Sequence, residues 1–265
     1  VVAARARDPA AFARVTAAQR RLAEGAPGGR RAATATLALR RQGVAEIWPL
    51  VAAVAEATSA PASGGTEVEI ELGLVEALGA SRDPRARPAL EAWLARHRGD
   101  PRRTRAGAAA LGRLGDDAAV VALLDLAARA PDDLALLSGL GECRRLPVAE
   151  HLARALAASP DPARARVVVR ALRDVAGARV WRTPAVRASG EGDAVRSLAV
   201  DALLAAAFTA SPALSGDLAQ ALVAIDHPET AARLAAARSR AGGRARTELD
   251  DLSDAMSRLV RLARR

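Results

Sequence analysis

Residues 103–126 read RTRAGAAALGRLGDDAAVVALLDL, and this stretch decides the fold. It begins as an alanine-rich helical segment that runs to Gly115, and Asp116 then precedes a second apolar segment. Glycine is favoured just past the end of a helix, and aspartate is favoured just before the start of one. The stretch therefore predicts two helices joined by a very short turn.

The first of these helices contains an Ala-Leu step that recurs along the chain, once as Gly-Leu. The step occurs at Ala38-Leu39, Ala77-Leu78, Ala110-Leu111, Gly139-Leu140, Ala171-Leu172 and Ala202-Leu203. Successive steps are 39, 33, 29, 32 and 31 residues apart. Intervals of this length are typical of helical repeat proteins, in which each helix pair buries its apolar face against the next pair.

The composition favours the same architecture. Alanine supplies 70 of the 265 residues, whereas aromatic residues make up only 2% of the chain. Alanine is the best helix former, and aromatic residues are among those enriched in strands. We therefore expect an all-α protein, an α-α superhelix of about seven helix pairs.

We expect a single repeat domain over residues 1–265, with an N-terminal cap helix in 1–29, repeats over 30–246 and a C-terminal cap helix in 247–265. Asp8 and Pro9 are suited to the start of the first helix, and Thr247 to the start of the last. Residues 67–72 alternate polar and apolar side chains as a strand does, but their continuation keeps the repeat register and predicts a helix. The predicted helices and helix pairs are 9–24, 30–44 with 45–57, 67–97, 101–130, 132–158, 162–188, 193–224 and 227–264.

The stretch 103–126 resembles HEAT repeats, particularly the short bacterial HEAT-like repeats that also occur in phycobilin lyases. The turns at Asp83-Pro84 and at Asp226-His227-Pro228 are similar to the turns of such repeats. The resemblance implies a superhelix and no particular activity. The His-Glu pairs that bind metal in HEAT-like di-iron hydroxylases are missing, because no histidine of this chain is followed by glutamate.

The residue inventory excludes several classes of chemistry. The chain has no lysine, which excludes a Walker A motif and a pyridoxal Schiff base. Its three histidines, His97, His151 and His227, have no second ligand at metal-binding spacing. We expect no catalytic residue, no cofactor and no metal, and we predict that the protein is not an enzyme. Cys143, the one cysteine, is interpreted as a core residue; a thiolate activated by Arg144 and Arg145 is the alternative.

A group of arginines is the candidate site for a partner. All 39 basic residues are arginine, and the net charge is +9. Residues 178–192 interrupt the repeat pattern, and such interruptions often map to a functional face. The predicted partner-binding residues are Arg166, Arg170, Arg173, Arg179, Trp181, Arg182 and Arg187. Trp181 is the tryptophan that we most expect to be exposed, but even for Trp181 we favour a structural role, such as filling a gap beside a shortened helix.

These observations predict a non-enzymatic HEAT-like scaffold that mediates protein–protein interaction. The alternative is sequence-independent binding of a nucleic-acid backbone, such as duplex DNA, through the arginines. Neither a membrane nor a small molecule is expected as a partner. A cytoplasmic location is expected; because residue 1 is Val1 rather than Met, an exported mature chain or a fragment is the alternative.

Overall fold

The computed structural model describes residues 4–5, 8–24, 37–39, 41, 47–59, 66–159, 161–209 and 214–263. Every regular element within these residues is a helix, so the predicted all-α fold class is confirmed. The predicted helix 30–44 lies mostly outside the described residues, as does most of the linker after the helix predicted at 45–57.

The chain forms two compact units, residues Val1–Leu123 and Leu124–Arg265, and each is described separately. The single domain expected over the whole chain stays a prediction. The helices of the first unit are α2 (Pro9–Ala23), α4 (Trp48–Ser59), α5 (Thr66–Ala80), the short 3₁₀ helix η1 (Pro84–Ala86), α6 (Arg87–Arg96) and α7 (Pro101–Leu114). The boundary falls within α8 (Asp117–Arg129).

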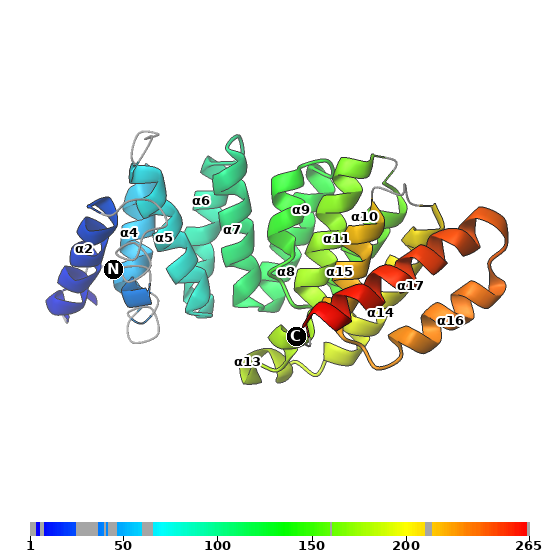
Figure 1. Ribbon diagram of the computed structural model, residues 1–265. Coiled ribbons are helices and arrows are strands. Elements are labelled where there is room, and N and C mark those ends of the chain that lie inside the picture. Colours follow the sequence, from blue (N-terminus) through cyan, green and yellow to red (C-terminus); the bar gives the residue numbers. More distant parts are fainter. Residues whose placement is uncertain are drawn as a thin grey trace. The chain divides into compact units, whose positions relative to one another are not determined.

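The helices of the second unit differ widely in length, from four residues to 21 (Figure 1). They are α9 (Leu134–Leu140), α10 (Leu146–Ala157), α11 (Pro162–Ala176), α12 (Ala178–Trp181), α13 (Pro184–Arg187), α14 (Gly192–Thr209), α15 (Ser215–Ile225), α16 (Thr230–Arg240) and α17 (Gly243–Ala263). In both units a helix also packs against a helix that is not its neighbour in the chain. Thus α5 contacts α7, α4 contacts α6, α9 contacts α11, and α10 contacts α14, beyond the short helices α12 and α13 in the chain.

The recurrent Ala-Leu step marks where neighbouring repeats touch. The leucine of every step is fully buried, at 0% exposure. Two residues after the step alanine, Gly79 of α5 lies so close to Ala110 of α7 that a Cβ atom on the glycine would fall 2.5 Å from the Ala110 Cα. In the second unit, a Cβ atom on Gly141 would fall 3.1 Å from the Cα of Ala171 in α11. The steps therefore recur because small residues let successive helices approach backbone to backbone.

The alternating segment 67–72 is helical and belongs to α5, as predicted. The opening helix is also confirmed: α2 spans Pro9–Ala23, and the Asp8 carboxylate accepts a hydrogen bond from the Ala11 backbone N–H at 2.9 Å. The prediction that the closing helix starts at Thr247 is wrong. Helix α17 begins at Gly243, so Thr247 lies inside its first two turns and does not cap it.

Candidate functional site

The predicted arginine row lies on α11 of the second unit. Asp161 starts this helix, because its carboxylate accepts hydrogen bonds from the backbone N–H groups of Ala163 and Arg164 at 3.1 and 3.0 Å. Helical spacing then separates two faces. The apolar face is fully buried, with Val168, Leu172 and Val175 at 0% exposure. The opposite face carries the three predicted arginines Arg166, Arg170 and Arg173, which are half-buried or exposed.

Two of these arginines hold one carboxylate. Asp217, in the first turn of α15, accepts from Arg166 Nε at 2.9 Å through Oδ2. Its Oδ1 accepts from Arg170 Nε and Nη2 at 3.1 and 3.0 Å. The Asp217 side chain is only 15% exposed, whereas that of Arg170 is 55% exposed. Arg173 instead pairs with its neighbour Asp174 at 2.9 Å. On this face two guanidinium groups thus share one carboxylate, and each carboxylate oxygen accepts from a different arginine.

The remaining predicted arginines lie on the short helices that follow. Arg179, Arg182 and Arg187 are all exposed. Arg182 is 3.9 Å from Asp226, a loose contact between two side chains that are largely in solvent. No hydrogen bond or ion pair joins the side chain of Arg179 or Arg187 to another side chain or backbone group in the described part of the chain.

The prediction that Trp181 is the most exposed tryptophan is wrong. Its side chain is only 7% exposed, and Trp48 is the tryptophan that is half-buried. The Trp181 indole N–H donates to the backbone oxygen of Val175 at 2.9 Å. A Cβ atom on Gly192 would come within 2.9 Å of the ring, so the indole packs directly against the start of α14. Trp181 therefore fills the space beside the short helix α12, which is the structural role favoured from the sequence.

Other arginines near helix starts have structural roles that spacing alone does not reveal. Arg164 donates to the backbone oxygens of Ala155 and Pro131, at 2.9 and 3.2 Å. Arg196, in the first two turns of α14, donates to the backbone oxygen of Ile225 at 3.1 Å. Each arginine follows an aspartate by three residues, Asp161 and Asp193 respectively. This Asp-x-x-Arg spacing is a sequence signal for arginines that link helix ends rather than bind partners.

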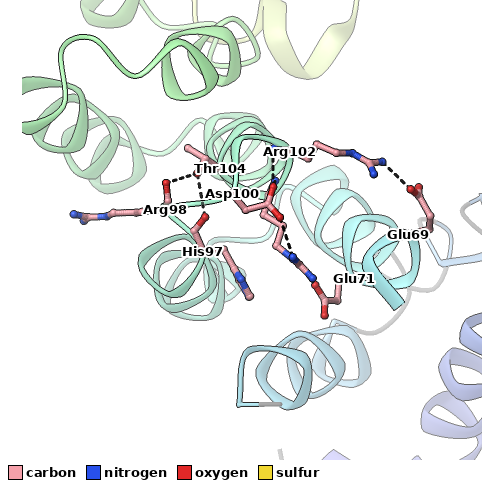
Figure 2. Close-up of polar contacts among 8 residues, drawn as sticks. Glu69, Glu71, His97, Arg98, Asp100, Arg102 and Thr104 are labelled. Atoms are coloured by element: carbon pink, nitrogen blue, oxygen red, sulfur yellow. Dashed lines mark hydrogen bonds and ion pairs between the residues drawn. The ribbon is translucent and has the colours of Figure 1, made fainter. Parts of the chain in front are cut away.

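The same spacing in the first unit produces a buried ion pair (Figure 2). Asp100 caps α7, and Arg103 donates to Asp100 Oδ2 at 2.9 Å and to Glu71 Oε2 of α5 at 2.8 Å. The side chains of Arg103 and Glu71 are both 7% exposed. The hydrogen bond to Glu71 raises the pKa of Arg103 against the effect of burial. Burial raises the pKa of Asp100, but hydrogen bonds from Arg103 and Arg102 outweigh it and leave that pKa below its ordinary value.

His97 lies beside this pair and is buried, with 8% exposure. Its ring centroid is 4.8 Å from that of Trp93, and its backbone oxygen accepts from the Thr104 hydroxyl at 3.2 Å. Burial lowers the pKa of His97, and the nearby Arg103 lowers it further. Neither His97 Nε2 nor Trp93 Nε1 has a hydrogen-bond partner among the described residues. Burial and the Arg103 charge thus both favour the neutral form of the ring.

The candidate metal ligands and the candidate nucleophile Cys143 can be placed in the described part of the chain. The described residues contain no group of three or more His, Cys, Asp or Glu side chains arranged to hold a metal ion. Cys143 is fully buried, in agreement with its interpretation as a core residue. Burial lowers the pKa of His151 on α10, and the charges of Arg154 and Arg164 lower it further. None of the described helices is long and apolar enough to cross a bilayer.

Solved structures show similarity to this chain, whereas sequence families do not. No family model matches the chain, and no curated protein does. A solved structure of human deoxyhypusine hydroxylase in complex with glycerol matches 95% of this chain and 98% of that one, with 19% sequence identity and a TM-score of 0.38. At this similarity the match transfers no reaction, substrate or site residue to this chain.

The match nevertheless corrects two predictions from the sequence. The protein was predicted not to be an enzyme, and its function was predicted to be a non-enzymatic scaffold with nucleic-acid binding as the alternative. Both predictions took a helical repeat without a recognisable catalytic motif as evidence against catalysis. The matched protein is by its name a hydroxylase, and hence an enzyme, and this finding stands against both predictions. A helical-repeat fold is no argument against enzymatic activity, because a fold does not fix a function.

Proposed function

We propose that the second unit binds an acidic polypeptide segment on an arginine surface. The arginine surface consists of Arg166, Arg170, Arg173, Arg179, Arg182 and Arg187. The bound segment is either a lasting partner or the substrate of a reaction, because recognition precedes both. Trp181 is left out of this surface because it is buried.

The observation that carries the proposal is the exposure of Arg170 together with its hydrogen bonds. Its guanidinium group is half in solvent and holds the Asp217 carboxylate through Nε and Nη2, while no hydrogen bond in the described residues uses Nη1. Arginine presents its N–H groups in a planar fork that matches carboxylates. Arg179 and Arg187 add exposed positive charge without a partner nearby. A surface with these properties attracts acidic side chains electrostatically and offers them directional hydrogen bonds.

The proposal is tested with a fluorescein-labelled oligoglutamate peptide and an oligoglutamine control, by fluorescence anisotropy at neutral pH. We expect the glutamate peptide to bind with an affinity that falls as salt is added, and the glutamine peptide not to bind. Arg179→Ala combined with Arg182→Ala should weaken binding by about tenfold, which corresponds to about 1.4 kcal/mol. The melting temperature should not change, since both side chains are exposed.

A matched control removes the same charge elsewhere. Arg96→Ala combined with Arg98→Ala takes two exposed arginines from the first unit and should leave the peptide affinity within about twofold of the parent. Equal losses in the two double variants would mean that only net charge matters, and the surface would be wrongly assigned. Tighter binding of duplex DNA than of the glutamate peptide would also contradict the proposal.

We further propose that the chain is a HEAT-repeat protein. The aspartate caps of α7 and α11 and the glycine-to-alanine contacts between successive repeats support this assignment. An experimental structure in which the helix pairs do not stack in a common direction would refute it.

A further inference from the structure

We propose that Asp217 is an internal competitor for the arginine surface: it occupies the position that a carboxylate of the acidic segment takes when the segment binds. This inference rests on the function proposed above. It adds the chemical group of the ligand that the arginines recognise and an intramolecular contact that weakens ligand binding. The group is the carboxylate of an aspartate or glutamate side chain.

The first argument compares the hydrogen-bond partners of Asp217 with those of other aspartates at helix starts. Asp100, Asp133 and Asp161 accept hydrogen bonds from backbone N–H groups of the helices they precede. Asp217 also lies in a first helical turn, but the start of α15 has no side-chain cap, and the carboxylate points its oxygens at α11. Its hydrogen bonds thus serve two arginines 47 and 51 residues away rather than its own helix.

The second argument is the exposure of the contact. Asp217 is 15% exposed, but its partners Arg166 and Arg170 are 38% and 55% exposed. Ion pairs with this much solvent around one partner are weak, because water and salt screen them. A competing carboxylate from solvent can therefore reach the guanidinium of Arg170 without opening the core. By contrast, the Arg103–Glu71 pair of the first unit is buried on both sides and offers no such access.

The third argument concerns the competition between Asp217 and a ligand carboxylate for the same arginines. A carboxylate tethered beside its binding position has a high effective concentration, and a ligand must displace it before it binds. Removing the tethered carboxylate therefore strengthens ligand binding, provided that the arginines keep their positions. The helix backbone of α11 holds those positions, since its opposite face is fully buried.

The test measures binding of the fluorescein-labelled oligoglutamate peptide to the full chain and to Asp217→Asn. Asparagine keeps the size of the side chain and removes its charge. We expect the variant to bind about three to tenfold more tightly than the parent. Asp254→Asn is the control, because it makes the same change in net charge at an exposed position on α17 that has no ion pair among the described residues. It should shift the affinity by less than about twofold.

The outcomes separate this inference from the function on which it rests. If the parent binds the peptide through the arginines and Asp217→Asn binds equally or more weakly, Asp217 is a structural tie and the competitor role is wrong. An equal gain in Asp254→Asn would likewise overturn it. If neither the parent nor Asp217→Asn binds, the proposed function itself fails. Adding Arg170→Ala to Asp217→Asn should abolish the gain, and a gain that persists would place the competition elsewhere.

Discussion

Two glutamates on the same helix form ion pairs of very different strength. Glu71 pairs with Arg103 at 2.8 Å, and both side chains are buried. Glu69 pairs with Arg102 at 2.7 Å, but Arg102 is 63% exposed. The distances are nearly equal, so the surroundings decide the energy. Removing one partner of a buried pair leaves an uncompensated charge out of water, whereas an exposed charge returns to solvent.

We therefore predict that Glu71→Gln lowers the free energy of unfolding by up to about 3–5 kcal/mol, because Arg103 keeps its ion pair with Asp100. Glu69→Gln, two residues away on α5, should lower it by no more than about 1 kcal/mol. Urea unfolding followed by tryptophan fluorescence measures both changes. If the two variants are equally stable, the Arg103–Glu71 pair is not buried in solution.

His97 makes the first unit sensitive to acid. Burial, and then Arg103, lower its pKa in the folded state from an ordinary value of 6.5, and Glu71 and Asp100 oppose Arg103. The unfolded chain therefore binds the proton more tightly, and the stability contributed by neutral His97 is present above about pH 6.5 and is lost as the pH falls below it.

The expected result is a free energy of unfolding that drops between about pH 7.5 and pH 5.5, and drops less in His97→Leu than in the parent. His151, whose pKa is also lowered by burial, contributes in the same direction to both proteins and cancels in the comparison. Asp100 loses its contribution only at lower pH, because its pKa lies below its ordinary value. Identical pH profiles for parent and variant would show that His97 is not held neutral.

At the scale of helices, the approach of α5 to α7 depends on one missing side chain. A Cβ atom on Gly79 would lie 2.5 Å from the Cα and 2.7 Å from the backbone oxygen of Ala110, and backbone atoms cannot turn aside as a side chain does. We predict that Gly79→Ala destabilises the fold by about 1–3 kcal/mol through overpacking, although alanine favours helix.

The control for this prediction is Gly99→Ala, since a Cβ atom there would meet nothing within 4 Å. Its stability should stay within about 0.5 kcal/mol of the parent in the same urea titration. A Gly79→Ala variant that is as stable as Gly99→Ala would mean that the two helices are further apart than described.

At the scale of the whole molecule, the described residues contain helices and no strand. The far-ultraviolet circular dichroism spectrum should therefore show the double minimum of an α-helical protein and no measurable strand content. The prediction concerns residues 67–72 in particular, where the local alternation of side chains is that of a strand. A substantial strand component would contradict both the fold class and the register of α5.

The fold of the whole molecule does not determine its function. The same class of fold serves binding proteins and enzymes alike, so the function has to be argued from individual residues. Sequence reasoning went wrong where it moved from the class of fold to the absence of catalysis. The individual contacts of the arginine surface support a binding proposal without that step.

The fold class and most helix positions could be predicted from the order of residues along the chain. Helix periodicity, aspartate caps and the regular return of a small residue before leucine fixed the all-α class and most helix positions, because these signals act within a few residues. The spacing of Arg166, Arg170 and Arg173 likewise placed them together on one face of α11. Even the strand-like segment 67–72 was assigned correctly, since the repeat register extends beyond it.

Only the tertiary structure decided which side chains are buried and what they contact. Trp181 lies in an irregular segment with arginines on both sides, yet it is buried because Gly192 leaves room for its ring. Arg103 pairs with Glu71 from a helix 32 residues earlier, and Arg166 pairs with Asp217 from one 51 residues later. Burial and ion pairing depend on contacts between residues that are distant in the chain. The local sequence pattern of one helix does not show which other helix packs against it.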